Sequence, residues 1–158
     1  MIILGVDPGF ERLGIAILEK QKGSKKEQVL FSECFKTSVK LEFSKRLSLI
    51  GKEVKKIIKK YKPEILAIET LFLTTNQKTV MRVAEARGVV MYEASLAKLK
   101  IFETSPPQIK IATTGYGKAN KEQVMKMVKI LVEINNAKES DDELDAIAIA
   151  LTASAHIR

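Results

Sequence analysis

Five short segments of the chain have the length and the apolar character of β-strands. The continuous apolar run at 2–7 is typical of a strand buried on both faces, whereas 28–37 alternates between apolar and polar positions. The polar, glycine-containing stretch at 21–28 is typical of a hairpin connection. The predicted strands are residues 2–7, 13–18, 28–37, 64–69 and 100–104.

Longer segments repeat their apolar positions every three or four residues, which predicts helices. The clearest is 43–61, and Pro63 lies just beyond its predicted end, where a proline stops a helix. A final helix is expected from about Ser140 to His156. The remaining helices are expected at 77–99, in a short segment that opens at Pro106 and Pro107, and at 121–133, with a loop at 113–120.

The order of these elements predicts a fold class. Three successive strands are followed by strands that alternate with helices, which indicates a mixed sheet, antiparallel on one side and parallel on the other. A chain of 158 residues suits one core, which would bury about 70% of the surface of the unfolded chain. No repeat, low-complexity segment or linker interrupts it. We therefore expect one α/β domain over residues 1–158.

Four acidic residues occupy positions that are otherwise apolar. Asp7 and Glu69 each end an apolar run, and Asp142 and Asp145 lie three residues apart on one face of the final predicted helix. Since functional groups collect at the carboxyl ends of parallel strands, adjacent strands would present Asp7 and Glu69 side by side. Carboxylates gathered in apolar surroundings cost several kcal/mol unless a cation or a proton neutralises them. Oxygen ligands of this kind suit two Mg²⁺ ions, or Mn²⁺, in phosphodiester hydrolysis.

Each acid also has a simpler interpretation. Asp7 precedes Pro-Gly and is a common turn residue. Asp142 lies in the first helical turn, where acids favour the helix dipole and where Ser140 and Glu143 have the spacing of a capping box. Asp145 lies beyond that turn and beside the apolar stripe, so capping does not explain it. Taken together, the four acids favour a metal-dependent nuclease.

The charge of the chain points to a polyanionic partner. Lys and Arg number 27 against 19 Asp and Glu, giving a net charge of +8, with lysines clustered at 55–62 and 98–129. The first cluster also fits the solvated face of an amphipathic helix.

No stretch approaches the ~18 apolar residues that cross a bilayer, and the N-terminal run lacks the basic flank of a secretory signal. A single cysteine, Cys34, excludes an internal disulfide and favours a reducing compartment, the cytoplasm; its alternating strand indicates a core or half-buried thiol and not a catalytic one.

Several ordered motifs resemble one family. The segments GVDPGFERLGIA, AIETLF and DDELDAIAIA, in this order and spacing, resemble the RuvC family of Holliday-junction resolvases. The resemblance spans nearly the whole chain and includes Gly14, the Ala-Arg-Gly at 86–88 and the G-x-G-x-A-x-K run at 115–121. Thr70 stands where the family often has Gln, a position that is not a ligand.

The resemblance implies a ribonuclease-H-like fold, with a mixed five-stranded sheet flanked by helices, and an enzyme that resolves four-way DNA junctions. It would nick two symmetric strands during recombination and repair, as a homodimer, with a branch-migration helicase complex as a further candidate partner. The acids named above match the catalytic metal-binding acids of the family. Lys110 and Lys121 match basic residues near the scissile phosphate, and Phe72 matches an aromatic that stacks on unpaired bases. A core position for Phe72 is equally open.

The loop at 113–120 adds two candidates from its own composition. Lys118 lies in this glycine-containing loop, between the two lysines that match the family, and is a further candidate for DNA binding. Tyr116, between Gly115 and Gly117, would touch a base or merely cover the surface.

The helix predicted at 77–99 has two apolar sides, which favours a partner subunit on the outer one. Coverage of both sides within the monomer is the open alternative. The expected outer strip is Ala84, Gly88, Met91 and Ser95, and the expected sheet-facing side is Val83, Val90, Ala94 and Ala97.

Three other functions compete with junction cleavage. A related nuclease of the same fold acting on RNA or other DNA structures would share the acids but not the region of Lys110 and Lys121. A non-catalytic junction-binding protein would have lost the acids, and all four are present. An ATPase of the actin and sugar-kinase type also opens with Asp-x-Gly, but it needs a second domain and a later glycine-rich motif that this chain lacks.

Overall fold

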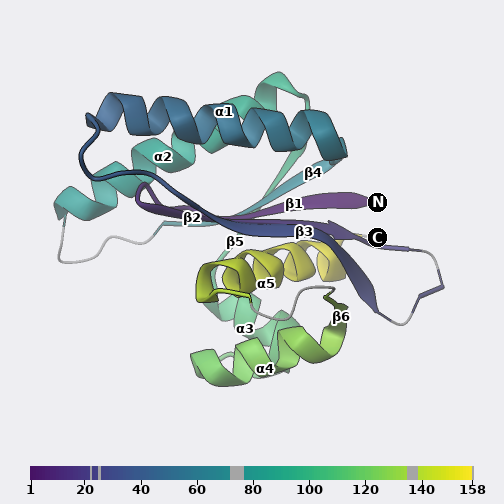
Figure 1. Cartoon of the computed structure of the whole chain (residues 1–158). Coiled ribbons are helices and arrows are strands. Elements are labelled where there is room, and N and C mark those ends of the chain that lie inside the picture. The colour runs from purple at the N-terminus through teal and green to yellow at the C-terminus, as the bar shows by residue number, and fades with distance from the viewer. Residues whose placement is uncertain (22, 25, 72–76, 135–138, 158) are drawn as a thin grey trace.

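The computed structural model describes residues 1–21, 23–24, 26–71, 77–134 and 139–157, and it forms one sheet with helices on both faces (Figure 1). The strands are β1 (Ile2–Asp7), β2 (Arg12–Glu19), β3 (Glu27–Lys36), β4 (Ile65–Glu69), β5 (Lys100–Thr104) and β6 (Val132–Glu133). The helices are α1 (Phe43–Tyr61), α2 (Gln77–Leu96), α3 (Pro106–Thr114), α4 (Lys121–Leu131) and α5 (Asp141–His156).

The sheet is mixed, as predicted, with the strand order β5-β4-β1-β2-β3-β6. Strands β1, β4 and β5 are parallel, and β2 pairs antiparallel with both β1 and β3. The prediction of five strands was wrong by one. Val132 and Glu133, expected inside a helix over 121–133, instead pair with Glu27 and Gln28 in a sixth strand. Two residues are too short to show any periodicity in a sequence.

Helices α1 and α2 cover one face of the sheet, and α3, α4 and α5 cover the other (Figure 1). Helix α1 is amphipathic, with Ile50, Val54 and Ile57 in the core and lysines outside. Helix α5 differs, because it is buried on every side from Ala146 to Ser154. Its inner side packs on β1 and β2, while α3 and α4 cover its outer side. No helix in the described part of the chain is long and apolar enough to traverse a bilayer.

Two glycines allow α5 to lie directly on the strands. A Cβ atom at Gly5 would come within 2.3 Å of the carbonyl oxygen of Ala146, and one at Gly14 within 2.2 Å of that of Asp142. Both distances are shorter than van der Waals contact permits, so only glycine fits at either position. Since Gly14 pairs with Asp7 across β1 and β2, this approach brings the first turn of α5 next to the end of β1.

Helix α2 follows the predicted two-sided pattern in part. Val90 and Ala94 are buried as expected, and Gly88 lies on the open side, where a Cβ atom would meet nothing within 4 Å. Two expectations were wrong: Ala97 lies past the end of the helix and is exposed, and Met91 packs against the core instead of facing outward. The helix ends three residues earlier than predicted, because the chain turns at Lys98 with a positive φ of 60°.

Candidate active site

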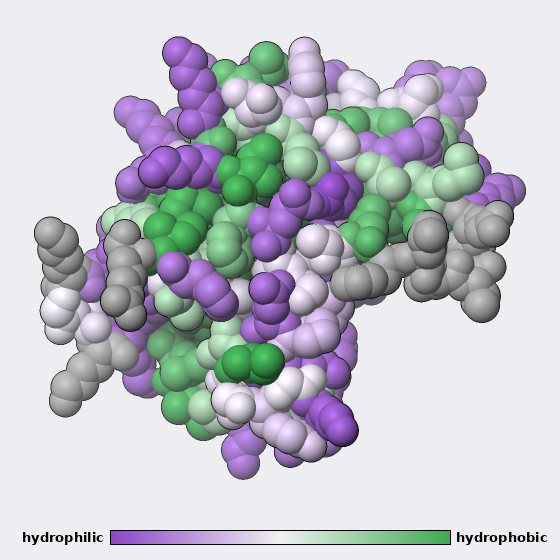
Figure 2. Space-filling view, turned by 180° about the vertical axis from the view of Figure 1, so that it is seen from behind, coloured by the Kyte–Doolittle hydropathy of each residue, from purple (hydrophilic) through white to green (hydrophobic). Residues whose placement is uncertain are grey.

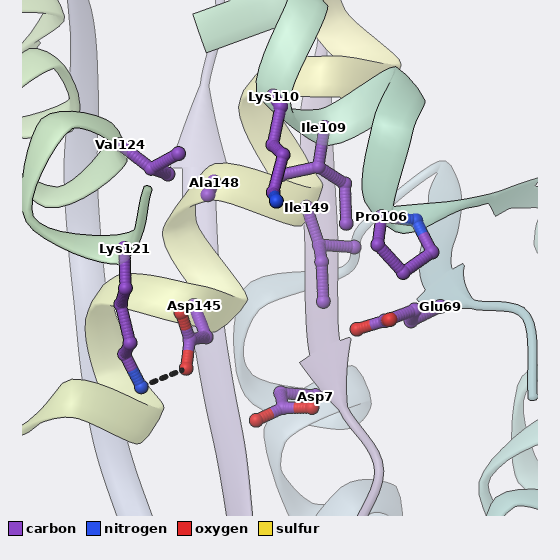
Figure 3. Close-up of a pocket in the computed structure, with 10 residues that line it drawn as sticks. All are labelled: Asp7, Glu69, Pro106, Ile109, Lys110, Lys121, Val124, Asp145, Ala148 and Ile149. Atoms are coloured by element: carbon purple, nitrogen blue, oxygen red, sulfur yellow. Dashed lines mark hydrogen bonds and ion pairs between the residues drawn. The ribbon is translucent and has the colours of Figure 1, made fainter. Parts of the chain in front are cut away.

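Three of the four predicted acids line one cavity. Asp7 is the last residue of β1 and Glu69 the last of β4, and the register that pairs Val6 with Ile68 puts both at the same end of the sheet. Asp145 reaches the cavity from α5 (Figure 3). The volume is about 250 Å³. Its lining residues are Asp7, Glu69, Asp145, Lys110 and Lys121, with apolar walls from Pro106, Ile109, Val124, Ala148 and Ile149.

The lysines are held by the caps of their helices. Ser105 and Gln108 form a capping box at the start of α3, which carries Lys110, and Asn120 and Gln123 form another at the start of α4, where Lys121 is the first residue. Gly115, with φ of 75°, ends α3 in the left-handed conformation. Lys110, in the middle of α3, and Lys121, at the start of α4, therefore line the same cavity as the acids, and Lys121 contacts Asp145 (Figure 3).

The molecular surface is open at this end of the sheet. Figure 2 shows the outline hollowed at one side, between the part that carries α1 and α2 and the part that carries α3 and α4. The carboxyl ends of β1 and β4 point to that side in Figure 1.

The acids repel one another in partly apolar surroundings. Burial raises the pKa of Asp7 to about 7, and the negative charges of Asp145, Glu69 and Asp142 add to that rise. Burial also raises the pKa of Glu69, again with a contribution from Asp145. Burial raises the pKa of Asp145 too, although its hydrogen bond with Lys121 acts in the opposite direction. Without added positive charge, this cluster is costly to ionise.

Asp142 does not line the cavity with the other three acids. Its Oδ2 accepts a hydrogen bond of 2.9 Å from Nε of Arg12 and forms an ion pair with the same guanidinium. The thiol of Cys34, half-buried as expected, lies 3.4 Å from the same oxygen. Burial alone would raise the pKa of Asp142, but the hydrogen bonds from Arg12 and Cys34 outweigh it and hold the pKa below its usual value.

The capping interpretation of this turn is also confirmed. The hydroxyl of Ser140 accepts from the backbone N–H of Glu143, and the carboxylate of Glu143 accepts from the backbone N–H of Ser140 at 2.8 Å. Asp142 is therefore a first-turn acid and a neighbour of the acidic cluster at once.

The donor chemistry of the cavity fits a hard divalent cation, but its geometry is not yet that of a metal site. The acidic side chains that line the cavity offer carboxylate oxygens, which are ligands that Mg²⁺ and Mn²⁺ prefer. In the described residues, however, no three Asp, Glu, His or Cys side chains are arranged to hold an ion. Protein cations neutralise the α5 acids instead: Nζ of Lys121 lies 3.1 Å from Asp145 and 3.4 Å from Asp141. A metal ion at this site would therefore require the carboxylates to change position.

The other candidates divide between the cavity and the surface. Lys110 lines the cavity and forms no ion pair with any described residue. Lys118 is exposed and lies outside the cavity, and Tyr116, 58% exposed, lies over a separate depression beside α4. Phe72 lies outside the described residues.

Two arginines that the sequence analysis did not single out contact the acidic residues. Arg12 holds Asp142, and Arg87 donates from Nε to the backbone carbonyl of Glu69 at 3.0 Å while its guanidinium pairs with Glu103. Arg87 therefore ties α2 to the end of β4. Both lie within the motifs quoted above, but the sequence does not indicate which acid or carbonyl each arginine reaches.

Comparison with known proteins identifies the family. The family model described as "Crossover junction endodeoxyribonuclease RuvC" matches residues 3–153. The chain belongs to the RuvC family. A RuvC from Halothermothrix orenii is 44% identical over 151 residues, covering 96% of this chain and 90% of the relative. The RuvC structure from Thermus thermophilus superposes with a TM-score of 0.90 at 31% identity, covering 99% of this chain and 95% of that one. The expected ribonuclease-H-like fold is thereby confirmed.

A second RuvC structure shows the family with its substrate. The T. thermophilus RuvC in complex with a Holliday junction matches with a TM-score of 0.92 at 31% identity, covering 99% of this chain and 94% of that one. The present backbone is therefore close to that of a relative with DNA bound.

Proposed function

We propose that this protein resolves four-way DNA junctions by metal-dependent, paired nicking of two symmetric strands during recombination and repair. The observation that carries the proposal is the cavity where Asp7, Glu69 and Asp145 meet Lys110 and Lys121, in a chain of the RuvC family. The whole described chain acts as one nuclease domain in this proposal. The basic charge of the chain, +8, supports a nucleic-acid substrate.

The residues divide the work of hydrolysis between them. The reaction adds water across a phosphodiester: a P–O bond forms to the oxygen of water, the bond to the leaving oxygen breaks, and that oxygen receives a proton. Two Mg²⁺ ions, or Mn²⁺, held by Asp7, Glu69, Asp145 and Asp142 would supply positive charge that favours the attack and stabilises the leaving oxygen.

The remaining groups bind and orient the phosphate. Lys110, with no ion pair among the described residues, has its ammonium free to contact a phosphoryl oxygen and to stabilise charge that develops there. Lys121 would give up its ion pair with Asp145 and contact a phosphoryl oxygen instead. The apolar walls, such as Ile109 and Ile149, limit water around the reacting atoms and so strengthen these interactions. Tyr116, Lys118 and Phe72 complete the proposed DNA contacts outside the cavity.

The proposal includes a homodimer that acts in the cytoplasm. Gly88, Ala84 and Ser95 are exposed along α2, and so are the large apolar side chains of Met81 and Tyr92. An apolar helix face of this kind favours a second copy of the chain, and a two-fold axis would place two sites on two like strands. The resemblance extends the proposal to a branch-migration helicase complex as a partner.

A direct test compares a synthetic four-way junction with a linear duplex of matched sequence, each with and without Mg²⁺. We expect symmetric nicks on two opposite strands of the junction, only with metal, and no cleavage of the duplex. The matched control is Glu69→Gln, which removes one carboxylate without changing side-chain size. Equal cleavage of duplex or RNA would favour the related nuclease instead, and binding without any cleavage would favour a non-catalytic junction-binding protein.

A further inference from the structure

The side chain of Asp142 is already occupied in the protein. One oxygen, Oδ2, accepts from Nε of Arg12 at 2.9 Å, pairs with the terminal nitrogen of the same guanidinium and lies 3.4 Å from the sulfur of Cys34. Arg12 begins β2 and Asp142 lies in the first turn of α5, so the pair joins segments 130 residues apart. Among the described residues, no other proposed metal ligand has its carboxylate paired with an arginine; Arg87 reaches only the backbone carbonyl of Glu69.

The backbone of Asp142 is packed directly against β2. Its carbonyl oxygen lies only 2.2 Å from the position that a Cβ atom on Gly14 would occupy, so the first turn of α5 is in contact with β2. The side chain is less constrained, because it is only partly buried and is 21% exposed. Asp142 can therefore change partner by rotating its side chain while its backbone stays in place.

Arg12 is suited to exchange a carboxylate for a phosphate. Its side chain is 52% exposed and borders a shallow hollow formed by residues of the β1–β2 turn and of α2. The planar guanidinium binds either anion through two parallel hydrogen bonds. A DNA backbone that reaches this edge of the site therefore offers Arg12 a chemically equivalent partner.

We infer that Arg12 is an internal counter-ion that competes with divalent metal for Asp142. This inference rests on the proposed metal site. In the DNA-free protein that site then has three available carboxylates, Asp7, Glu69 and Asp145. The fourth carboxylate becomes available when a DNA phosphate takes over the guanidinium. Metal binding at Asp142 and phosphate binding at Arg12 then reinforce each other, as linkage requires.

The first experiment titrates Mn²⁺ into DNA-free protein and measures affinity by calorimetry. The Asp142→Asn variant should bind Mn²⁺ with an affinity within about twofold of the wild-type value, because the Asp142 carboxylate is not available to the ion. Arg12→Gln should raise the affinity about fivefold, which is about 1 kcal/mol. In the Arg12→Gln background, Asp142→Asn should remove that gain. Asp145→Asn should weaken binding at least about tenfold in both backgrounds.

Two controls make these outcomes specific. Lys36→Gln removes one positive charge from an exposed residue that pairs with Arg12 across β2 and β3, and it should leave metal affinity within about twofold. Thermal melting in EDTA verifies that each variant is folded. If Asp145→Asn leaves the affinity unchanged, the proposed metal site is wrong. If Asp145→Asn weakens binding but Arg12→Gln does not strengthen it, only the inference on Arg12 is overturned.

The second experiment tests the exchange with phosphate. Mg²⁺ is titrated into protein alone and into protein saturated with linear duplex, which the proposed function leaves uncut, with the uptake by free duplex subtracted. The duplex should raise the Mg²⁺ affinity of the wild-type protein several-fold more than that of Arg12→Gln. An equal rise in both proteins would contradict the exchange.

Discussion

The two faces of the sheet are packed in different ways, and only one of them carries the acids. On the α1 side, an amphipathic helix rests on the strands through Ile50, Val54 and Ile57, with its lysines in solvent. On the α5 side, a helix buried all round touches the strand backbones through Gly5 and Gly14. Side chains separate the layers on one face, while backbones nearly meet on the other.

The difference shows how the site is built. Carboxylates from a strand and a helix share one cavity only if the helix axis lies unusually close to the strand. Glycine at the crossing permits this approach, at the cost of a weaker strand and of charge repulsion next to the core. The α1 face has no such requirement, so its interior follows ordinary side-chain packing. Substitutions on the two faces should therefore have unequal effects.

The largest expected effect is on the chemistry of the α5 face. Asp7→Asn should reduce junction cleavage with Mg²⁺ by at least about a thousandfold, because about 4 kcal/mol of charge stabilisation is lost with a metal ligand. Junction affinity, measured by gel shift, should change by less than about threefold, since affinity comes mainly from lysine–phosphate contacts. Cleavage at the wild-type rate would show that Asp7 is not a ligand.

The next largest effect is expected on stability, when one glycine from each face is replaced by alanine. Gly14→Ala should destabilise the fold by about 3 kcal/mol in urea unfolding, because the new methyl group meets backbone atoms of α5. Gly51→Ala in α1 should change stability by less than about 1 kcal/mol, since its methyl group meets side chains and no backbone, Val89 at 3.1 Å and Glu93 at 3.7 Å, and alanine favours the helix. Equal losses at both positions would remove the contrast between the faces.

The third effect is expected on turnover, when one lysine from each face is replaced by alanine. Lys121→Ala should lower the turnover of bound junction about a hundredfold while changing junction affinity much less, because its ammonium stabilises charge that develops in the transition state. Lys59→Ala, on the exposed side of α1, should change neither quantity by more than about twofold. Equal losses of turnover would indicate that the site uses only diffuse positive charge.

A smaller effect concerns pH and the metal-free protein. The pKa of Asp7 is raised from 3.8 to about 7 in the fold, so the native state holds a proton that the unfolded state releases between these values. Stability in EDTA should therefore fall as pH rises from about 4 to 7, by about 2 kcal/mol after allowance for relaxation around the site. Asp7→Asn should flatten this slope. A wild-type protein whose melting temperature does not fall over this range would contradict the raised pKa.

The smallest effect on the fold is expected on α2. Gly88 has open space around it, so Gly88→Glu should leave the melting temperature of the monomer nearly unchanged. In the proposed dimer the two-fold axis would bring two added anions together and separate the subunits, which sedimentation measures. Junction cutting should then stop at single nicks. A wild-type protein that is monomeric with and without junction would remove the basis for this prediction.

Elements with strong periodicity were predictable from the sequence alone. The pattern of α1 predicted its bounds, because an amphipathic helix next to a proline has clear limits. The strand ends at Asp7 and Glu69 were equally clear, since an acid after an apolar run breaks the pattern. Weak local signals failed: the sequence does not show the β6 pairing, which depends on a distant strand, or the early end of α2, where a residue other than glycine, Lys98, adopts a positive φ.

The order of amino acids specifies which acids the protein has, that two of them end strands and that two share one side of a helix. How their carboxylates group depends on the folded arrangement of the segments. Asp145 faces the cavity while Asp142 turns to Arg12, although the two lie three residues apart. The reason is physical: helical spacing sets which side of α5 an acid occupies, but the partner of its carboxylate depends on which cation another segment brings within reach.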